Sequence, residues 1–480
     1  MTAQRYDAVV VGSGPNGLTA AIVLARAGLS VLVLEANESA GGGTRSAELT
    51  LPGFVHDVCS AVHPLALASP YWQTLPLHEH GLEWIAQPAA FCHPFDDGTA
   101  AAMERSIDLT CAGWGQRDAR MYRALMAPLV GSWRDFYREA LAPLHLPRHP
   151  LTLARLGIRG LLATTWLTKM LFEGDEPRAL FAGVAAHATL PLDQPPSAVF
   201  GLILGVAGHA VGWPIPRGGS ASISRALLSY LQSLGGHVQT SRRVESLDDL
   251  PSSRLVVLDL TPRQVLRILA GCLPPLYRAQ LERFRYGLGT FKMDWVLDGP
   301  IPWRAEACRR AAAVHLGGTM EEIARSHSAA WAGRIPDPPF VILAQPTLFD
   351  RSRSPDEQHH IVWGYAHPPN GDDTDISDRI EAQLERFAPG FRARIVARHC
   401  LSPSELEQAN ANLVGGDING GESNLAQLLT RPALRPNPYT TPLPNVYVCS
   451  SSTPPGGGVH GMCGYHAAQA ALRRIRAGRI

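Results

Sequence analysis

The first forty residues place a glycine-rich break between two short apolar runs. Residues 9–11 are apolar throughout, which is typical of a buried strand. The break, residues 12–17, is followed by apolar positions spaced as on one face of a helix, at Leu18, Ile22 and Ala25. A second apolar run, residues 31–34, then ends the unit. This order predicts a strand, a tight turn, a helix and a second strand parallel to the first.

The glycines of the break have the spacing of a dinucleotide-binding turn. Gly12 permits a tight turn, Gly14 lets the backbone approach a pyrophosphate, and Gly17 lets the helix pack closely on the strand. The N-terminus of the helix offers unpaired N–H groups and a positive dipole end to the phosphates. A carboxylate after the second strand can accept hydrogen bonds from a ribose. The predicted dinucleotide site includes Gly12, Gly14, Pro15, Asn16, Gly17 and Glu35.

The rest of the chain alternates between helical and strand-like periodicity. Residues 291–297 alternate in the manner of a strand, with Phe291, Met293 and Trp295 on one face and Lys292 and Asp294 on the other. The stretch 61–213 predicts helices and loops. Helices are expected at 120–140, 177–188, 223–234, 376–387 and 464–472, and strands at 237–244, 254–260, 340–344, 360–365 and 446–449. Residues 216–220 predict a turn that caps the helix after it.

Two further glycine clusters identify the dinucleotide. After Glu35 come Gly41-Gly42-Gly43-Thr44-Arg45, and then Gly53-Phe54 and Asp57. This succession resembles the extended signature of the amine oxidase and phytoene desaturase superfamily of FAD enzymes. Near the other end, a strand leads into Pro454-Pro455-Gly456-Gly457-Gly458 and a helix. That pattern is similar to the C-terminal flavin motif of the phytoene desaturase, retinol saturase and carotenoid isomerase branch, and especially of the pyridine nucleotide-disulfide oxidoreductase domain proteins.

The resemblance runs from end to end and implies FAD as the cofactor. It implies that Gly42, Gly43, Thr44 and Arg45 lie against the diphosphate or the ring, and that the backbone at Val244 meets the adenine. It also implies that the ring is held at Gly457, Gly458, Val459 and His460. One departure is Cys449-Ser450, where many relatives have Cys-Gly. A second dinucleotide motif and a redox CxxC pair are both lacking, so disulfide chemistry is not expected.

The expected fold class is α/β, with a Rossmann-type FAD-binding domain built on a parallel sheet and an inserted α+β substrate domain. The discontinuous FAD-binding domain is expected to comprise residues 1–60, 214–265 and 440–480. Residues 61–213 and 266–439 are then expected to form the substrate domain, with an antiparallel sheet and helices.

Composition narrows the class of protein further. The 43 basic and 42 acidic residues nearly cancel, which gives no sign of a nucleic-acid partner. The eight cysteines show no zinc spacing, so we expect reduced thiols, no metal, and a cytoplasmic enzyme. No apolar run reaches the ~18 residues of a membrane span. Residues 161–172 could make a peripheral membrane contact through Leu161, Leu162, Trp166, Met170 and Leu171, although a helix packed on the core is the simpler interpretation.

Two residues are candidates for chemistry. Lys292, one of only two lysines, has a setting that looks like that of the amine oxidase lysine holding a water at flavin N5; the alternative is a surface lysine on a half-exposed strand. His460 lies within the predicted flavin loop and could transfer a proton near neutral pH, or it could only shape the loop. His63, His187 and His209 are further pocket candidates in apolar surroundings.

These observations predict an FAD-dependent oxidoreductase of the dehydrogenase, desaturase or saturase type. It would act on an apolar or polycyclic small molecule by hydride transfer at flavin N5, with oxygen, a quinone or another carrier as electron acceptor. Two alternatives stay open. One is a redox-neutral isomerase that uses reduced FAD, and the other is a non-catalytic escort of lipidated or prenylated partners with the same fold. The intact glycines and Glu35 argue against the escort.

Overall fold

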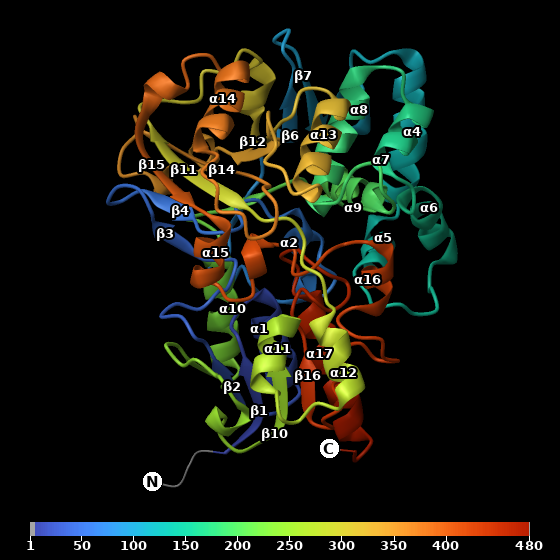
Figure 1. Cartoon of the computed structure of the whole chain (residues 1–480), viewed down its shortest axis with the longest axis vertical. Coiled ribbons are helices and arrows are strands. Elements are labelled where there is room, and N and C mark those ends of the chain that lie inside the picture. Colours follow the sequence, from blue (N-terminus) through green and yellow to red (C-terminus); the bar gives the residue numbers. More distant parts are fainter. Residues whose placement is uncertain (1–4, 480) are drawn as a thin grey trace.

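A parallel sheet of five strands forms the lower part of the molecule in Figure 1, a computed structural model that describes residues 5–479. The strand order is β16-β10-β1-β2-β9. The central strands are apolar and buried on both faces, as a sheet covered by helices on both sides requires. The strands are β1 (Tyr6–Val11), β2 (Val31–Leu34), β9 (His237–Gln239), β10 (Ser253–Leu258) and β16 (Val446–Val448).

Helices from three distant parts of the chain cover this sheet. One apolar core joins the sheet to α1 (Pro15–Arg26), α10 (Ala221–Ser233) and α17 (Met462–Arg476). A second core, on the other face, joins it to α11 (Pro262–Ile268) and α12 (Pro275–Glu282). The first and last segments of the chain are therefore neighbours in space.

A second, seven-stranded sheet lies above the first, in the order β15-β11-β14-β13-β12-β6-β7. It is antiparallel except where β12 pairs with β6. Two of its strands lie where only helices and loops were expected, because short alanine-rich runs carry almost no strand periodicity. The strands are β6 (Ala89–Pro94), β7 (Ala100–Glu104), β11 (Phe291–Leu297), β12 (Ala311–Leu316), β13 (Val341–Ala344), β14 (His360–Ala366) and β15 (Ile395–Leu401).

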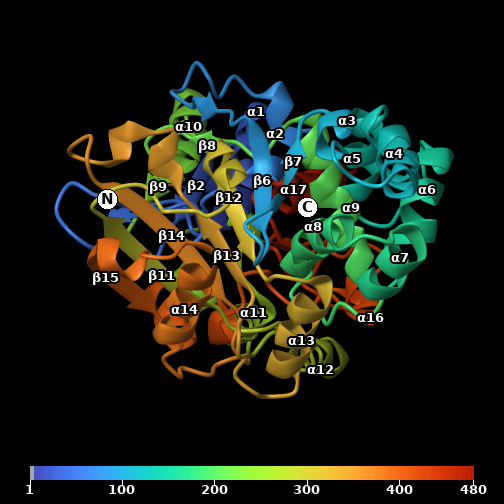
Figure 2. The ribbon, with the colours of Figure 1, turned by 90° about the horizontal axis from the view of Figure 1, so that it is seen from above.

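A cluster of helices lies beside this mixed sheet, on the right in Figures 1 and 2. The helix expected at 120–140 is broken at Gly131 and Ser132 into two. The largest apolar core of the described residues joins these helices to the face of the sheet. The helices are α4 (Gln116–Val130), α5 (Trp133–Ala140), α6 (Pro150–Gly160), α7 (Thr164–Leu171), α8 (Asp175–Ala185) and α9 (Ser197–Ala210).

Three local expectations need correction. The strand expected at 237–244 ends at Gln239, because Ser241 takes a left-handed conformation with φ of 53°. Ser220 does not cap α10, since its hydroxyl donates to the carbonyl oxygen of Ser60 instead. The Lys292 strand is buried on both faces rather than half exposed. The division of the chain into two domains stays a prediction.

The remaining helices and strands are not part of the two large sheets. None of the helices within residues 5–479 is both long and apolar enough to cross a membrane. The further helices are α2 (Pro64–Ala68), α3 (Ile107–Thr110), α13 (Met320–Trp331), α14 (Ser377–Phe387), α15 (Pro403–Ala409) and α16 (Leu425–Thr430), and the further strands are β3 (Ser46–Glu48), β4 (Val55–Asp57), β5 (Trp84–Ile85) and β8 (Ile215–Pro216).

Candidate active site

The N-termini of α1 and α17 meet at the carboxyl edge of the parallel sheet. Gly464, in the first turn of α17, lies directly on α1, because a Cβ atom there would be 1.9 Å from the carbonyl oxygen of Asn16. Ligands of open α/β sheets bind at this edge, where helix N-termini offer their N–H groups. The packing therefore brings the two glycine motifs, more than four hundred residues apart in sequence, to one place.

The glycines of the first motif are sterically required. Gly12 has φ of 97°, a conformation that side chains with a Cβ atom rarely adopt. A Cβ atom at Gly17 would lie 2.1 Å from the Gly12 carbonyl oxygen, and one at Gly42 would lie 2.9 Å from the Cα atom of Gly14. Gly17 thus serves close packing, as the sequence predicts, and Gly14 and Gly42 stack two backbone layers at the cavity wall.

A cavity of about 780 Å³ begins at these glycines and extends toward the mixed sheet. It places most of the predicted cofactor-binding residues on one wall. Gly17, Thr44 and Arg45 do not line it. The predicted residues that do are Gly12, Gly14, Pro15, Asn16, Glu35, Gly42, Gly43, Val244, Gly457, Gly458, Val459 and His460.

Thr44 and Arg45 shape the loop around the cavity. The Thr44 hydroxyl donates to the carbonyl oxygen of Gly41 at 2.8 Å. The Arg45 guanidinium donates to the carbonyl oxygens of Gly42 and Ala409, both at 3.0 Å. These hydrogen bonds fix the backbone of the second glycine cluster against the last residue of α15.

Two carboxylates lie beside the first glycine motif. Glu35 accepts hydrogen bonds from the backbone N–H and hydroxyl of Ser13, at 3.0 and 2.6 Å, and from the backbone N–H of Asn37. This network holds Glu35 at the end of β2, where the sequence predicts a ribose contact. Asp259, which the sequence analysis missed, accepts from the Gly17 N–H at 2.9 Å. Burial, together with the charge of Glu35, raises the pKa of Asp259 to about 7, although the Gly17 hydrogen bond opposes the shift.

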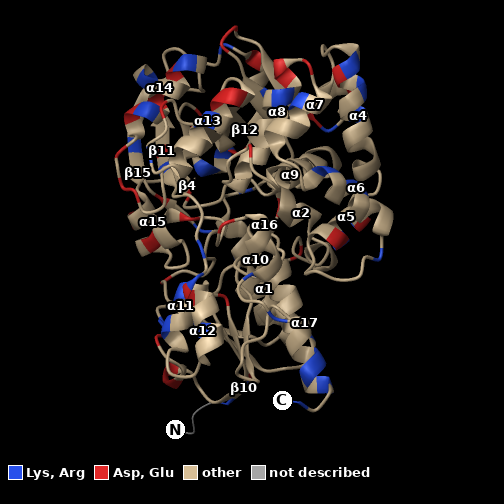
Figure 3. Ribbon diagram, turned by 45° about the vertical axis from the view of Figure 1, so that its right-hand side comes forward, with Lys and Arg blue, Asp and Glu red and all other residues tan. Residues whose placement is uncertain are grey.

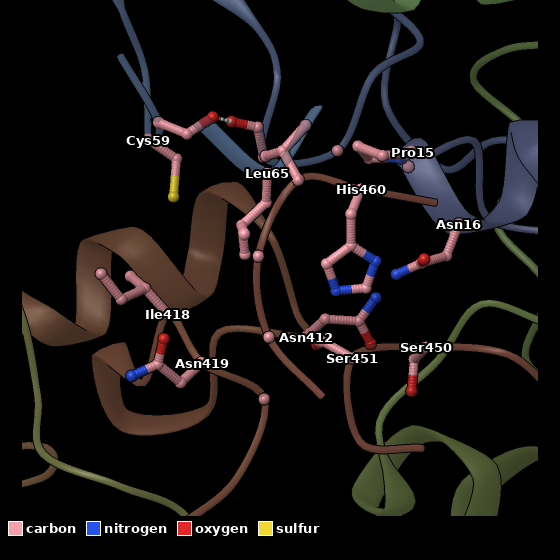
Figure 4. Close-up of a pocket in the computed structure, with 18 of the residues that line it drawn as sticks. Pro15, Asn16, Cys59, Leu65, Asn412, Ile418, Asn419, Ser450, Ser451 and His460 are labelled. Atoms are coloured by element: carbon pink, nitrogen blue, oxygen red, sulfur yellow. Dashed lines mark hydrogen bonds between the residues drawn. The ribbon is translucent and has the colours of Figure 1, made fainter. Parts of the chain in front are cut away.

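His460 is fully buried within the second glycine motif. Its Nδ1 accepts the backbone N–H of Met462 at 3.0 Å, so the ring proton sits on Nε2. Nε2 has no hydrogen-bond partner among the described residues. Burial lowers the pKa of His460 to about 4, so the ring is neutral at pH 7. Figure 4 shows the ring pointing toward Asn16, whose Oδ1 also lacks a partner.

Arg431 is a second cavity residue that the sequence analysis missed. Its guanidinium is buried under the second glycine motif, where a Cβ atom at Gly456 would lie 2.8 Å from Nη1. One nitrogen donates to the carbonyl oxygen of Gly420 at 3.3 Å, and Nε has no partner. No carboxylate of the described residues lies within ion-pair distance, and burial lowers the pKa of Arg431. The charge of the buried Asp417 carboxylate acts on Arg431 from beyond ion-pair distance. A buried cation without a carboxylate in direct contact is costly, which favours an anionic ligand in this cavity.

Lys292 is buried but does not line the cavity. Its ammonium forms an ion pair with Asp294, its neighbour on the same face of β11. His56 and His399 lie 3.4 and 3.7 Å from that carboxylate. Burial alone would raise the pKa of Asp294, but the charge of Lys292 and the two histidines hold it below its usual range. The interpretation of Lys292 as a surface lysine is wrong, and its catalytic role stays a prediction.

The far half of the cavity is an apolar chamber between α9, α6 and the mixed sheet. Its walls include Phe200, Ile203, Leu204, Trp213 and Trp363. A few polar groups interrupt these walls. The polar residues that line the cavity include His63, His187, Thr189 and Asn419. The Nε2 atom of His187 lies 3.1 Å from that of His315. His209, in contrast, lies outside the cavity, and its ring is hydrogen-bonded to the Tyr122 hydroxyl at 2.9 Å.

The first half of the cavity fits a flavin dinucleotide. It has a glycine cradle that side chains would fill, two helix N-termini and a carboxylate for a ribose. The unpartnered atoms of Asn16, His460 and Arg431 need a polar ligand, because buried polar groups are normally hydrogen-bonded.

Comparisons with known proteins agree with this geometry. The family model described as "NAD(P)-binding Rossmann-like domain" matches residues 10–75. The rat protein named "Pyridine nucleotide-disulfide oxidoreductase domain-containing protein 2" is 25% identical, over 98% of this chain and 94% of its own length. A limonene dehydrogenase component from Castellaniella defragrans is 24% identical over 97% of this chain and 94% of its own. "Hydroxyneurosporene desaturase" of Rhodobacter capsulatus is 31% identical over 28% of each chain.

Solved structures show the same fold. An oxidoreductase from Methanosarcina mazei has a TM-score of 0.66 at 16% identity, and the match covers 98% of this chain and 100% of that one. Wild-type putrescine oxidase bound to putrescine has a TM-score of 0.62 at 18% identity, over 98% and 99%.

The full-length matches and the cavity that joins both glycine motifs decide the assignment. The chain is an FAD-dependent oxidoreductase, and its sequence and fold are similar to those of the desaturase and amine oxidase proteins named above. The predicted fold class and cofactor of this oxidoreductase are thereby confirmed. The roles of individual residues stay predictions.

Proposed function

We propose that this flavoenzyme oxidises or saturates an apolar or polycyclic small molecule by hydride transfer. The observation that carries the proposal is the single cavity, whose glycine-lined half fits FAD and whose other half is an apolar chamber. When bound, FAD supplies the hydride acceptor or donor, N5 of its ring. The chain itself supplies binding, orientation and exclusion of water.

The chamber walls suit a hydrocarbon body. Phe200, Ile203, Trp213 and Trp363 offer aromatic and aliphatic surface, which holds an apolar substrate without fixed polar contacts. Holding a carbon atom in one place next to the cofactor contributes to rate by itself. The neutral His460 lines the cavity and carries its ring proton on Nε2, so it can donate a hydrogen bond to the cofactor or substrate.

The names of two relatives support this substrate class. One is a hydroxyneurosporene desaturase and another a limonene dehydrogenase component, and both names denote chemistry on hydrocarbon-bodied substrates. Oxygen, a quinone or another carrier would then take up the electrons.

Anaerobic mixing of the holoenzyme with candidate substrates tests the proposal. Limonene, a linear polyene and putrescine are added separately, and flavin absorbance is followed. The proposal predicts bleaching by an apolar compound and none by putrescine; the opposite result would overturn it. Ile203→Gln, which places an amide in the chamber, should slow the bleaching while FAD stays bound. The matched control is Leu276→Gln, an exposed leucine on α12.

A further inference from the structure

The segment between α5 and α8 exposes an unusual amount of apolar surface. Leu146 is 92% exposed and Ile158 is 73% exposed. Soluble proteins seldom keep such side chains together in water unless the surface binds something. Half of the large exposed apolar side chains of the described residues lie here, namely Leu144, Leu146, Leu151, Ile158, Leu161, Trp166 and Met170.

Helix α6 presents part of this surface as an outward stripe. Leu151, Ala154, Arg155 and Ile158 are exposed, at the spacing of one helix face. The opposite face, which includes Leu156, is buried toward α9. A helix at a protein surface normally turns polar residues outward, so α6 has an apolar side on both faces.

The charge of this segment has one sign. Residues 141–171 contain no aspartate or glutamate, in a chain with 42 acidic residues. They contain Arg148, Arg155, Arg159 and Lys169. Lys169 pairs with Glu321 at 3.4 Å, whereas the three arginine side chains make no ion pair with any residue in the described range 5–479. Exposed leucines beside unpaired arginines are the pattern of a surface that meets anionic lipid.

The cavity reaches the surface at the same place. Leu144 and Leu161 from this segment, and Leu425 and Leu429 from α16, are exposed and also line the cavity. Helices α6 and α16, which carry or adjoin these leucines, both lie on the right in Figure 1, and Figure 3 gives a second view of them. An apolar molecule that enters here passes from an apolar surface into an apolar chamber without crossing water.

We propose that this apolar and basic surface, defined as residues 144–170 with Leu425 and Leu429 of α16, docks on an anionic phospholipid bilayer. The apolar side chains would enter the headgroup region and the arginines would bind lipid phosphates. Docking would place the cavity opening against the lipid, from which an apolar compound enters. The proposed surface overlaps the peripheral membrane contact considered for residues 161–172, but it is centred on α6. Leu171 is buried and takes no part.

Co-sedimentation of the holoenzyme with vesicles tests docking without any assay of activity. The probes are vesicles of phosphatidylcholine alone and of phosphatidylcholine with phosphatidylserine. We expect binding to the anionic vesicles that weakens with salt, and little binding to the neutral ones. Arg155→Gln with Arg159→Gln should lower the partition coefficient roughly tenfold or more, and Leu146→Asp with Ile158→Asp should abolish binding. Val396→Asp, at an exposed position on β15 at the edge of the mixed sheet, should bind as the wild type does.

Two results would overturn the proposal. One is a wild-type holoenzyme that stays in solution with both kinds of vesicle, or variants of this surface that bind the anionic vesicles as strongly as the wild type does. The other is a dimer, measured by analytical ultracentrifugation without lipid, that Leu146→Asp dissociates, because the surface would then be covered by a second copy. The variants change exposed residues only, and their FAD content reports that they are folded. Because lipid binding is measured without turnover, its failure is distinct from a failure of the proposed reaction.

Discussion

Asp259→Asn should remove a pH dependence that a single buried carboxyl gives this protein. The Asp259 side chain lies under the first glycine motif with one backbone hydrogen bond, from Gly17, and with the negative charge of Glu35 nearby. Burial raises its pKa from the usual 3.8 to about 7. The folded protein therefore keeps a proton on Asp259 over a pH range in which the unfolded chain has lost it.

The sign and size of the effect follow from that shift. Because the folded state binds the extra proton on Asp259, the contribution of this group to the free energy of unfolding falls as pH rises from about 4 to about 7. Above about pH 7 this contribution no longer changes. At about 1.4 kcal/mol for each pH unit, the loss amounts to about 4 kcal/mol. The asparagine keeps the shape and can still accept the Gly17 hydrogen bond, but it has no charge to bury. Relative to wild type, Asp259→Asn should gain about 4 kcal/mol of stability between about pH 4 and about pH 8.

Urea unfolding of both proteins across this pH range measures the difference between their free energies of unfolding. Every other titrating group contributes equally to both proteins and cancels in this difference. FAD binding gives a second readout, because a diphosphate at Gly14 would add negative charge beside Asp259; wild-type affinity should fall above pH 7 and that of the variant should not. Asp7→Asn is the control for sign, since hydrogen bonds from Ser30 lower the pKa of Asp7. A stability difference between wild type and Asp259→Asn that stays constant with pH would refute the reasoning.

Three further substitutions test other parts of the site. Gly464→Ala places a Cβ atom 1.9 Å from a carbonyl oxygen of α1, so α17 must move and FAD binding, read from the visible spectrum, should be lost. Arg431→Met removes the buried cation under the second glycine motif; the holoenzyme should show a lower FAD midpoint potential, because a nearby positive charge favours the reduced anionic ring. Lys292→Met leaves the Asp294 carboxylate buried without its ammonium and should lower the urea-unfolding free energy by about 3–5 kcal/mol.

Each of these substitutions has its own contradicting result. Gly271→Ala is the control, because this glycine has open space around it, and the variant should bind FAD normally. If Gly464→Ala also bound FAD normally, the close packing of α17 on α1 would not be needed for FAD binding. An Arg431→Met holoenzyme with an unchanged potential would show that the guanidinium does not act on the ring. A Lys292→Met protein of full stability would mean that the buried ion pair contributes nothing to folding.

The sequence predicts the parts of the site that depend on local chemistry. The βαβ unit, its glycines and Glu35 follow from spacing within forty residues, and the structure places Gly12, Gly14 and Glu35 on one cavity wall and Gly17 in the packing behind it. The flavin loop at 454–458 was likewise visible as glycines before a helix. Such features can be predicted because backbone conformation and helix N-termini are properties of short segments.

The parts that were missed depend on contacts between distant segments. Asp259 and Gly17 are hydrogen-bonded although 242 positions separate them in sequence, and no local sequence pattern predicts that contact. Arg431 follows a short helix in a stretch without periodicity, so only the fold shows that its charge is buried. The Lys292–Asp294 pair could have been read from sequence, because alternate strand residues share a face.

The most direct test of the split FAD site is the flavin content of the purified chain. The protein is expressed, its visible spectrum recorded, and the flavin released by denaturation and measured against protein. We predict a yellow protein that holds one FAD per chain, and Gly14→Val and Gly464→Ala variants, one from each motif, that hold none. A colourless protein that takes up no FAD on reconstitution would contradict the assignment, as would a Gly464→Ala variant that retains it fully.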